Sequence, residues 1–294
     1  MLILKTIKDI NNQVVELKEM GKKVGFVPTM GALHEGHISL IRLSNRENDL
    51  TVCSIFVNPT QFNDPKDFEK YPITLESDMQ KLIAAKCDIL FLPTVAEMYP
   101  KGLKNSEPID FGYIAGTLEG EFRPGHFDGM AQIVEKLLRA VAPHRLYMGQ
   151  KDYQQAMICT RLIKKRNLKI KIVVCPIKRE KDGLAMSSRN VRLDARSRKV
   201  AVEISKVLKS MKGRAARGEG RTPKPPKGGF NTVTAIEQKA FERLAAFPEF
   251  KVEYVAIRDA KTLKPIQKIS ATTHAVALIA ARIGGVRLID NMLL

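Results

Sequence analysis

The sequence lacks tryptophan, has few aromatic residues and has no long apolar run. Only 6% of its 294 residues are aromatic. The longest apolar run, residues 275–281, is much shorter than the roughly 20 residues that a membrane-spanning helix needs. The opening residues also lack the basic, apolar and small-residue order of a signal peptide. We therefore expect a cytoplasmic protein with no membrane partner.

Cysteine is scarce as well. The four cysteines are far apart, and none belongs to a Cys-x-x-Cys pair; they are Cys53, Cys87, Cys159 and Cys175. Each lies in an apolar segment. This spacing argues against a disulfide framework and against a cysteine-rich metal site. We predict four buried free thiols.

Acidic residues are the third shortage. The chain has 31 Asp and Glu against 49 Lys and Arg, so its net charge is +18 at pH 7. Half of this excess lies in residues 196–227, where eleven Lys or Arg accompany two Glu. No aromatic side chain that could stack on a base lies in that segment. We expect no specific nucleic-acid partner; a protein that binds nucleic acid by nonspecific attraction is the alternative from another class.

Short apolar runs alternate with helical patterns through the first part of the chain. Residues 24–27 are predicted to form a buried strand, and helical apolar spacing begins at residue 38. Further strands are predicted at residues 51–57, 88–93, 145–148 and 170–174, and further helices at 7–19, 74–86 and 130–141. This alternation predicts βαβ units with right-handed crossovers, and hence an α/β fold with a doubly wound parallel sheet.

The pattern changes after Pro176, and we place a domain boundary between residues 177 and 178. Helices are predicted at residues 197–211 and 233–246, and strands at 252–257, 275–280 and 286–289. Residues 213–231 are rich in glycine, proline and basic residues, which predicts a mobile basic loop. Residues 178–294 are therefore predicted to form a second, smaller α+β domain.

The stretch 28–37 is the first candidate for chemistry. Gly31 and Gly36 allow a sharp turn between the strand and the helix, and the amino end of the helix favours an anion. His34 and His37 lie at the same helix end, where imidazoles can donate hydrogen bonds to phosphoryl oxygens. A metal-binding pair or a solvated helix start are the alternatives.

Two further polar segments could contact a nucleotide. Lys151 and Asp152 lie at a strand-to-helix turn, although Asp152 could instead cap the following helix. Ser187, Ser188 and Arg189 offer two hydroxyl donors and a fixed cation, which suits a triphosphate. For these three residues a surface turn is the alternative.

Several strings, in one order along the chain, closely resemble the motifs of the pantothenate synthetase (pantoate-β-alanine ligase) family. They lie at residues 27–37, 56–62, 121–129, 148–155, 182–190 and 284–291. That family belongs to the nucleotidyltransferases with a His-x-Gly-His type motif and a Rossmann-like fold. The resemblance implies a homodimer that condenses pantoate with β-alanine, converting ATP to AMP and pyrophosphate through an enclosed pantoyl adenylate.

The resemblance also implies roles for individual residues. The implied catalytic residues are His34, His37 and Lys151. The implied ATP-binding residues are Met30, Gly149, Lys151, Asp152, Met186, Ser187, Ser188 and Arg189. The implied pantoate-binding residues are Met30, Gln61 and Gln155. Residues 1–177 would then bind ATP and pantoate, and residues 178–294 would act as a lid.

Magnesium is expected chemically, because pyrophosphate departs from ATP with a large negative charge. Asp78 occupies the acidic position that the family associates with the metal, but Ser77 stands where a second acid is common and Ile73 where arginine is usual.

Arg123 and His126 match a family motif near the active site and the subunit contact. Another enzyme of the superfamily, with a phosphorylated acceptor, is the alternative.

Overall fold

The computed structural model describes residues 1–63, 65–103, 109–217, 232–269 and 274–294. The chain divides into two compact units, Met1–Lys178 and Arg179–Leu294. The predicted division lies between residues 177 and 178, and the roles assigned to its two parts stay predictions. No helix in the described part of the chain is long and apolar enough to cross a bilayer.

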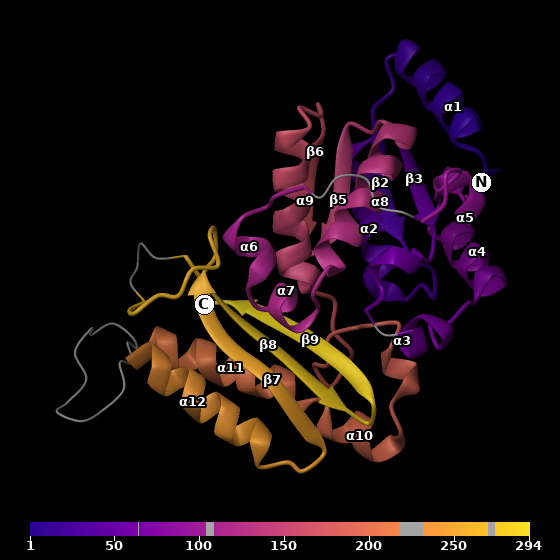
Figure 1. Ribbon diagram of the computed structural model, residues 1–294. Coiled ribbons are helices and arrows are strands. Elements are labelled where there is room, and N and C mark those ends of the chain that lie inside the picture. Colours follow the sequence, from indigo (N-terminus) through magenta and orange to yellow (C-terminus); the bar gives the residue numbers. More distant parts are fainter. Residues whose placement is uncertain (64, 104–108, 218–231, 270–273) are drawn as a thin grey trace. The chain divides into compact units, whose positions relative to one another are not determined.

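The first unit is built on a six-stranded parallel sheet with the strand order β1-β4-β3-β2-β5-β6. Figure 1 labels β2, β3, β5 and β6 of this sheet. The strands are β1 (Leu2–Leu4), β2 (Val24–Thr29), β3 (Leu50–Ile55), β4 (Ile89–Phe91), β5 (Arg145–Gly149) and β6 (Lys171–Cys175). The predicted α/β fold with a doubly wound parallel sheet is confirmed. The sequence patterns did not indicate β1, because three residues are too few to show a period.

Helices connect these strands and fall into two groups by contact. α2 (Glu35–Glu47) contacts α4 (Leu75–Ala84), whereas α8 (His126–Val141) contacts both α1 (Ile7–Glu19) and α9 (Tyr153–Lys165). Right-handed crossovers that run outward from β2 in opposite directions put their helices on opposite faces of the sheet. The shorter helices are α3 (Pro65–Glu69), α5 (Val95–Met98), α6 (Tyr113–Gly116) and α7 (Glu119–Phe122).

The core of this unit lies between the sheet and its helices. One cluster joins β2, β3 and β4 to α2 and α4, and its members Val27, Leu82 and Leu90 are completely buried. All four cysteines are free and buried, which confirms the prediction. Burial raises the pKa of the Cys159 thiol to about 12, so it is protonated and unreactive at neutral pH.

The strand order reverses between β2 and β5, which lie side by side in the sheet. From β2 the chain proceeds through β3 to β4, whereas β6 lies on the other side of β5. In open α/β sheets ligands bind at the carboxyl ends of the strands at such a reversal. The fold therefore brings the segments that follow β2 and β5 to the position where a ligand is expected.

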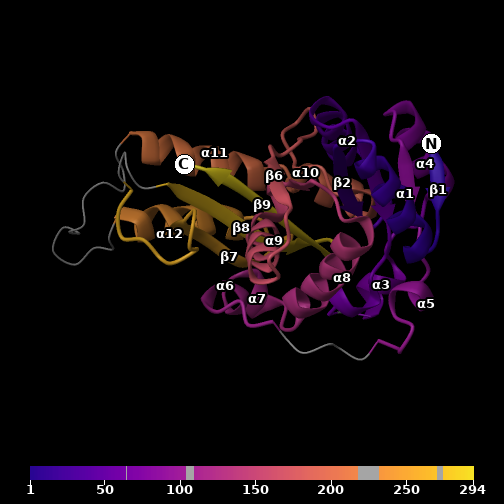
Figure 2. The ribbon, with the colours of Figure 1, turned by 90° about the horizontal axis from the view of Figure 1, so that it is seen from above.

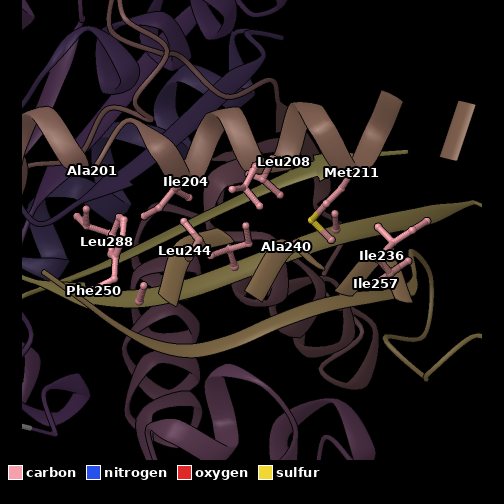
Figure 3. Packing of buried hydrophobic residues seen from close by; sticks show 14 of the residues in the cluster. Ala201, Ile204, Leu208, Met211, Ile236, Ala240, Leu244, Phe250, Ile257 and Leu288 are labelled. Atoms are coloured by element: carbon pink, nitrogen blue, oxygen red, sulfur yellow. The ribbon is translucent and has the colours of Figure 1, made fainter. Parts of the chain in front are cut away.

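The second unit is a three-stranded antiparallel sheet covered by helices. Its strands are β7 (Phe250–Asp259), β8 (Ala275–Ile283) and β9 (Val286–Leu293), in that order. α11 (Glu203–Ala216) and α12 (Thr232–Ala245) pack against each other and against these strands (Figure 2). Leu208 and Leu244 are completely buried in the cluster between helices and strands (Figure 3).

Some element boundaries differ from those predicted. The helix predicted at residues 197–211 is two helices, α10 (Ala195–Val200) and α11, and α11 extends to Ala216. The predicted basic loop at 213–231 therefore begins inside a helix, and its residues 218–231 lie outside the described residues. α8 begins at His126 rather than at residue 130, so it includes part of a segment that was predicted to be irregular.

Candidate active site

The turn between β2 and α2 presents the two histidines. Its backbone has positive φ at Gly31 (79°) and at Ala32 (47°), and His34 is the N-cap residue of α2. The Nδ1 atom of His34 accepts a hydrogen bond from the backbone N–H of Gly36 at 3.1 Å. The Nδ1 atom of His37 accepts one from the backbone N–H of His34 at 3.3 Å. The two rings lie 4.1 Å apart, so both side chains belong to the helix cap.

These hydrogen bonds determine where the imidazole protons are. An Nδ1 atom that accepts a hydrogen bond carries no proton, so the ring proton of each histidine lies on Nε2. Burial, and then the positive charge of Lys151, lowers the pKa of His34 to about 4. Burial, and then His34, lowers the pKa of His37 well below its ordinary value. At neutral pH both rings are neutral Nε2–H donors.

Neither Nε2 atom has a hydrogen-bond partner within the described residues. Two neutral N–H donors at the amino end of a helix suit an anion with several oxygens, such as a polyphosphate. The alternative of a metal-binding pair is disfavoured, since both Nδ1 atoms already accept backbone hydrogen bonds and the described residues contain no group of three or more His, Cys, Asp or Glu that could hold a metal.

Lys151 and Asp152 follow β5, at the neighbouring strand end. They lie in a short 3-10 helix, Gln150–Asp152, directly after Gly149, the last residue of β5. The Lys151 Nζ atom is 3.8 Å from Asp152 Oδ1. Asp152 precedes α9, but its side chain makes no hydrogen bond to the first turn of that helix. Asp152 thus occupies the N-cap position of α9, as that alternative expects, but without a capping hydrogen bond from its side chain. Lys151 lies close enough to His34 for its positive charge to lower the pKa of that histidine.

Two of the three predicted pantoate residues are in direct contact. The Gln61 amide Nε2 lies 2.8 Å from the Met30 sulfur, and the Asn58 amide donates to Gln61 Oε1 at 3.3 Å. Gln61 ends a 3-10 helix, Pro59–Gln61, that follows β3. Gln155 lies in the first turn of α9, partly exposed, and no hydrogen bond in the described part of the chain joins it to Gln61 or Met30.

The amino end of α8 holds Gln61 in place. The Gln61 carbonyl accepts hydrogen bonds from His126 Nδ1 at 2.9 Å and from Arg123 at 3.4 Å. Because Nδ1 of His126 carries the proton, its Nε2 accepts from Arg123 Nη1 at 3.1 Å. Burial, and then the charge of Arg123, lowers the pKa of His126 to about 4. His126 is therefore neutral and structural at neutral pH.

Gly129 permits this contact, and sequence reasoning missed it. A Cβ atom at Gly129 would lie 2.2 Å from the Thr60 carbonyl oxygen, so only glycine lets α8 approach the loop so closely. The only sequence signal was the position of Gly129 at the end of the motif that contains Arg123 and His126. The motif thus contains three residues that hold the Gln61 loop.

Asp78 contacts the histidine turn rather than other acidic residues. Its Oδ2 atom accepts from the Ala32 N–H at 2.8 Å, and its Oδ1 atom accepts from the Leu33 N–H at 2.7 Å and from Thr74 Oγ1 at 3.2 Å. The residue is only 1% exposed. Magnesium is usually held by one or two carboxylates together with substrate phosphates. With both oxygens engaged and no second carboxylate in a metal-binding group of described residues, these residues do not fit a protein-held magnesium site.

In the second unit, Met186, Ser187, Ser188 and Arg189 lie in one loop, which leads directly into a 3-10 helix, Asn190–Arg192. The loop is built on hydrogen bonds within itself. The Ser187 hydroxyl accepts from the Arg189 N–H at 3.3 Å, and the Asn190 side chain donates to the Ala185 carbonyl at 3.0 Å. These bonds give the loop a defined shape.

A partly buried ion pair fixes the base of that loop. Arg179 binds both Asp290 oxygens through its two terminal guanidinium nitrogens, Nη1 and Nη2, at 2.6 and 2.9 Å, and Nη1 also donates to the Gly183 carbonyl at 3.1 Å. The backbone of Arg179 also pairs with Ala185 in an isolated antiparallel β-bridge. Ala185 directly precedes Met186, so Arg179 connects the ion pair to the start of the loop. Asp290 lies in the last of the matching strings, residues 284–291, so that string supplies one partner of this ion pair.

Comparison with known proteins gives matches to one family over nearly the whole chain. The profile of the family described as Pantoate-beta-alanine ligase matches residues 2–293. The chain is 44% identical over 292 residues to a pantothenate synthetase of Bacteroides fragilis, covering 99% of this chain and 98% of that protein. It is 45% identical over 294 residues to a pantothenate synthetase of Cytophaga hutchinsonii, covering 100% of this chain and 99% of that protein.

Solved structures are similar over the same length. Pantothenate synthetase from Thermus thermophilus matches with a TM-score of 0.89 and 38% identity, covering 99% of each chain. Pantoate-beta-alanine ligase from Francisella tularensis, complexed with beta-gamma ATP and beta-alanine, matches with a TM-score of 0.78 and 38% identity, covering 100% of this chain and 97% of that chain.

Proposed function

The chain belongs to the pantoate-beta-alanine ligase family, and from that premise we propose that it joins pantoate to β-alanine in a reaction driven by ATP. The observation that carries this proposal is the pair of neutral imidazoles at the amino end of α2, with Nε2–H groups available to phosphate oxygens. ATP and β-alanine as substrates are supported by the complex described for the Francisella tularensis relative.

In the first step, a pantoate carboxylate oxygen attacks the α-phosphorus of ATP. A bond forms between that oxygen and phosphorus, the bond from the α-phosphorus to the bridging oxygen breaks, and pyrophosphate leaves with the electron pair. Negative charge grows on the phosphoryl oxygens during this displacement. His34, His37 and Lys151 donate to these oxygens and stabilise the transition state more than the ground state.

In the second step, the amine of β-alanine attacks the acyl carbon of pantoyl adenylate. The carbon–nitrogen bond forms, the bond from the acyl carbon to the phosphate oxygen breaks, and AMP leaves while the amine loses a proton. A free carboxylate is a poor acyl donor, whereas its mixed anhydride with AMP has a good leaving group. This difference is the chemical reason why the reaction consumes ATP.

Pantoate is proposed to bind beside Gln61, Gln155 and Met30. The amides of the two glutamines can donate to a carboxylate or hydroxyl group, and the Met30 sulfur adjoins the Gln61 amide. Asp152 and Gly149 at the end of β5 are proposed to contact ATP, and a magnesium ion is proposed to be held by the ATP phosphates rather than by Asp78.

The second unit is proposed to act as a lid. Met186, Ser187, Ser188 and Arg189 would contact the triphosphate, and closure would shield the adenylate from water. We also propose a cytoplasmic homodimer, to be tested by sedimentation of the purified protein and by fractionation of cells.

The decisive experiment is a product assay in which each substrate is omitted in turn. We expect pyrophosphate release to require ATP and pantoate, and AMP release to require β-alanine as well. Pyrophosphate release that does not depend on pantoate would refute the proposal and would favour nucleotide transfer to another acceptor. A variant in which Gln61 is replaced by alanine should reduce the pantoate-dependent signal without removing ATP binding.

A further inference from the structure

We propose that Asp78 and Lys81 on α4 are positioning residues that hold the turn between β2 and α2 in the shape that presents His34 and His37. This inference rests on the proposed function for its effect on catalysis. Asp78 then has a role other than metal binding. Lys81, which no sequence motif indicated, has a role as well.

The contacts form a clamp on two consecutive residues of the turn. One Asp78 oxygen accepts the Ala32 N–H at 2.8 Å, and the other accepts the Leu33 N–H at 2.7 Å. Lys81 Nζ donates to the Leu33 carbonyl at 2.7 Å. Residues three apart on a helix lie on the same face, so one face of α4 binds both the donors and the acceptor of the turn.

The backbone of the turn needs such a clamp. Ala32 has a φ of 47°, a left-handed conformation that is strained for a non-glycine residue and persists only when its surroundings enforce it. Gly31 has a φ of 79°, and a Cβ atom there would lie 3.1 Å from Asp78 Oδ2. The absence of that Cβ atom lets the carboxylate reach the turn. Asp78 therefore binds the strained backbone of Ala32 at a point where Gly31 leaves room for its carboxylate.

The arrangement is unsuited to a cation. Both Asp78 oxygens point at backbone N–H groups, and the Lys81 ammonium lies on the same turn. The charged and titratable groups that act on the histidines are Lys151, Asp152 and Lys81 around His34, and Lys151, Lys81 and His34 around His37. The charge of Lys81 is among the causes that lower the pKa of both histidines. Lys81 therefore helps to keep both rings as neutral donors.

The first test compares Asp78→Asn with Glu76→Gln, an exposed residue of the same helix as the matched control. In Asp78→Asn an amide N–H group would face a backbone N–H group, so the turn should shift. A displacement of about 1 Å can cost about 100-fold in rate, and we expect a loss of that order in kcat for pantoate-dependent pyrophosphate release. The KM for pantoate should rise by a smaller factor than kcat falls, because none of the described hydrogen bonds of α4 reaches Gln61 or Gln155 and only Met30 of the proposed pantoate residues adjoins the turn.

A magnesium titration separates the clamp from a metal site. If Asp78 is a positioning residue, the magnesium concentration for half-maximal rate should be the same in Asp78→Asn and in the wild type. Recovery of the Asp78→Asn rate at high magnesium would overturn the proposal, and so would an unchanged kcat. Lys81→Met should lower kcat about tenfold, with the rate restored in Lys81→Arg, which keeps a donor and a charge; equal loss in both variants would count against the clamp.

A spectroscopic measurement does not depend on the activity. Imidazole ¹⁵N chemical shifts report which ring nitrogen carries the proton, and we expect the Nε2–H form for His34 and His37 in the wild type. The shifts should move in Lys81→Met and stay in place in Glu76→Gln. If the wild type shows no pantoate-dependent activity, the proposed function fails while this measurement still tests the clamp. Unchanged shifts in both Asp78→Asn and Lys81→Met would overturn the clamp alone.

Discussion

Two loops at the carboxyl edge of the parallel sheet carry the histidine pair proposed for chemistry and Gln61 proposed for pantoate, and different groups hold them. The turn after β2 is bound by charged side chains of α4, which contact the backbone of Ala32 and Leu33. The loop after β3 is bound by the amino end of α8, through a neutral histidine and a glycine that allows close approach.

The difference separates two kinds of effect. Damage to the turn after β2 should lower the rate of the chemical step, because the histidines lie there. Damage to the loop after β3 should weaken pantoate binding, because Gln61 lies there. Four predictions test this separation, from the largest expected effect to the smallest.

The largest effect is expected from His34→Ala and from Lys151→Ala. Each should remove about 3 kcal/mol or more of transition-state stabilisation if the side chain acts as a strong electrostatic donor. The measurement is the rate of pantoyl adenylate formation in a single turnover. His274→Ala, at an exposed histidine of the second unit, and Lys165→Ala, at an exposed lysine, are the matched controls. Near-normal adenylate formation in either test variant would contradict the assignment.

The second prediction concerns pH and the loop after β3. The pKa of His126 is lowered by burial from the usual 6.5 to about 4, so the unfolded chain binds more protons than the folded one between these values. Folding stability should therefore fall as the pH falls through this window, with about 2 kcal/mol lost at His126 between pH 7 and pH 5. Below pH 4, His126 should make no further contribution to the pH dependence of folding stability.

Urea denaturation at pH 7 and pH 5 tests this contribution. In His126→Asn the amide can still donate to the Gln61 carbonyl but does not titrate, so the variant should lose less stability on acidification than the wild type. The remaining pH dependence should come in part from His34 and His37, whose pKa values are also lowered by burial. The same pH dependence in variant and wild type would show that His126 is not the group that responds.

The third prediction is that Gly129→Ala damages the loop after β3 and leaves the histidine turn in place. A Cβ atom 2.2 Å from the Thr60 carbonyl must push the loop away from α8. Overpacking of this kind typically costs about 2 kcal/mol of stability, and the KM for pantoate should rise more than the KM for ATP. Gly116→Ala is the control, because a Cβ atom there meets nothing within 4 Å. Equal stability in the two variants would contradict the packing argument.

The smallest effect is expected from Gln61→Ala and Gln155→Ala. Each should cost about 1 kcal/mol of pantoate binding, the typical value of one neutral hydrogen bond, or roughly a fivefold rise in the KM. Initial rates measured against each substrate in turn would show whether the KM for ATP stays constant. If both substrates weakened equally, the assignment of these glutamines to pantoate would be wrong.

Much of the fold could be predicted, because its signals are local. The apolar runs around Val27 and Leu146 are continuous enough to indicate buried strands, and their alternation with helical patterns specifies a parallel sheet. The strand β1 and the start of α8 were missed. Three residues carry no period, and the glycine-rich segment before residue 130 hides the helix start at His126.

The site could be predicted in part. Local strings indicated His34 and Lys151, since both lie at strand-to-helix turns that are visible in the sequence, whereas Gln61 was implied only by the family resemblance. The same strings could not show what holds these residues. Asp78 lies 46 positions from Ala32, and His126 lies 65 positions from Gln61, so no local pattern reports those hydrogen bonds.

The sequence by itself determined the order of the elements, the absence of a disulfide framework, and the presence of two histidines at a strand-to-helix turn. Only the tertiary structure decided that burial keeps both imidazoles neutral and that Asp78 binds the turn. The physical reason is that the charge of a buried imidazole and the contacts of a buried carboxylate depend on partners that folding brings together. For Asp78, those partners lie far away in the sequence.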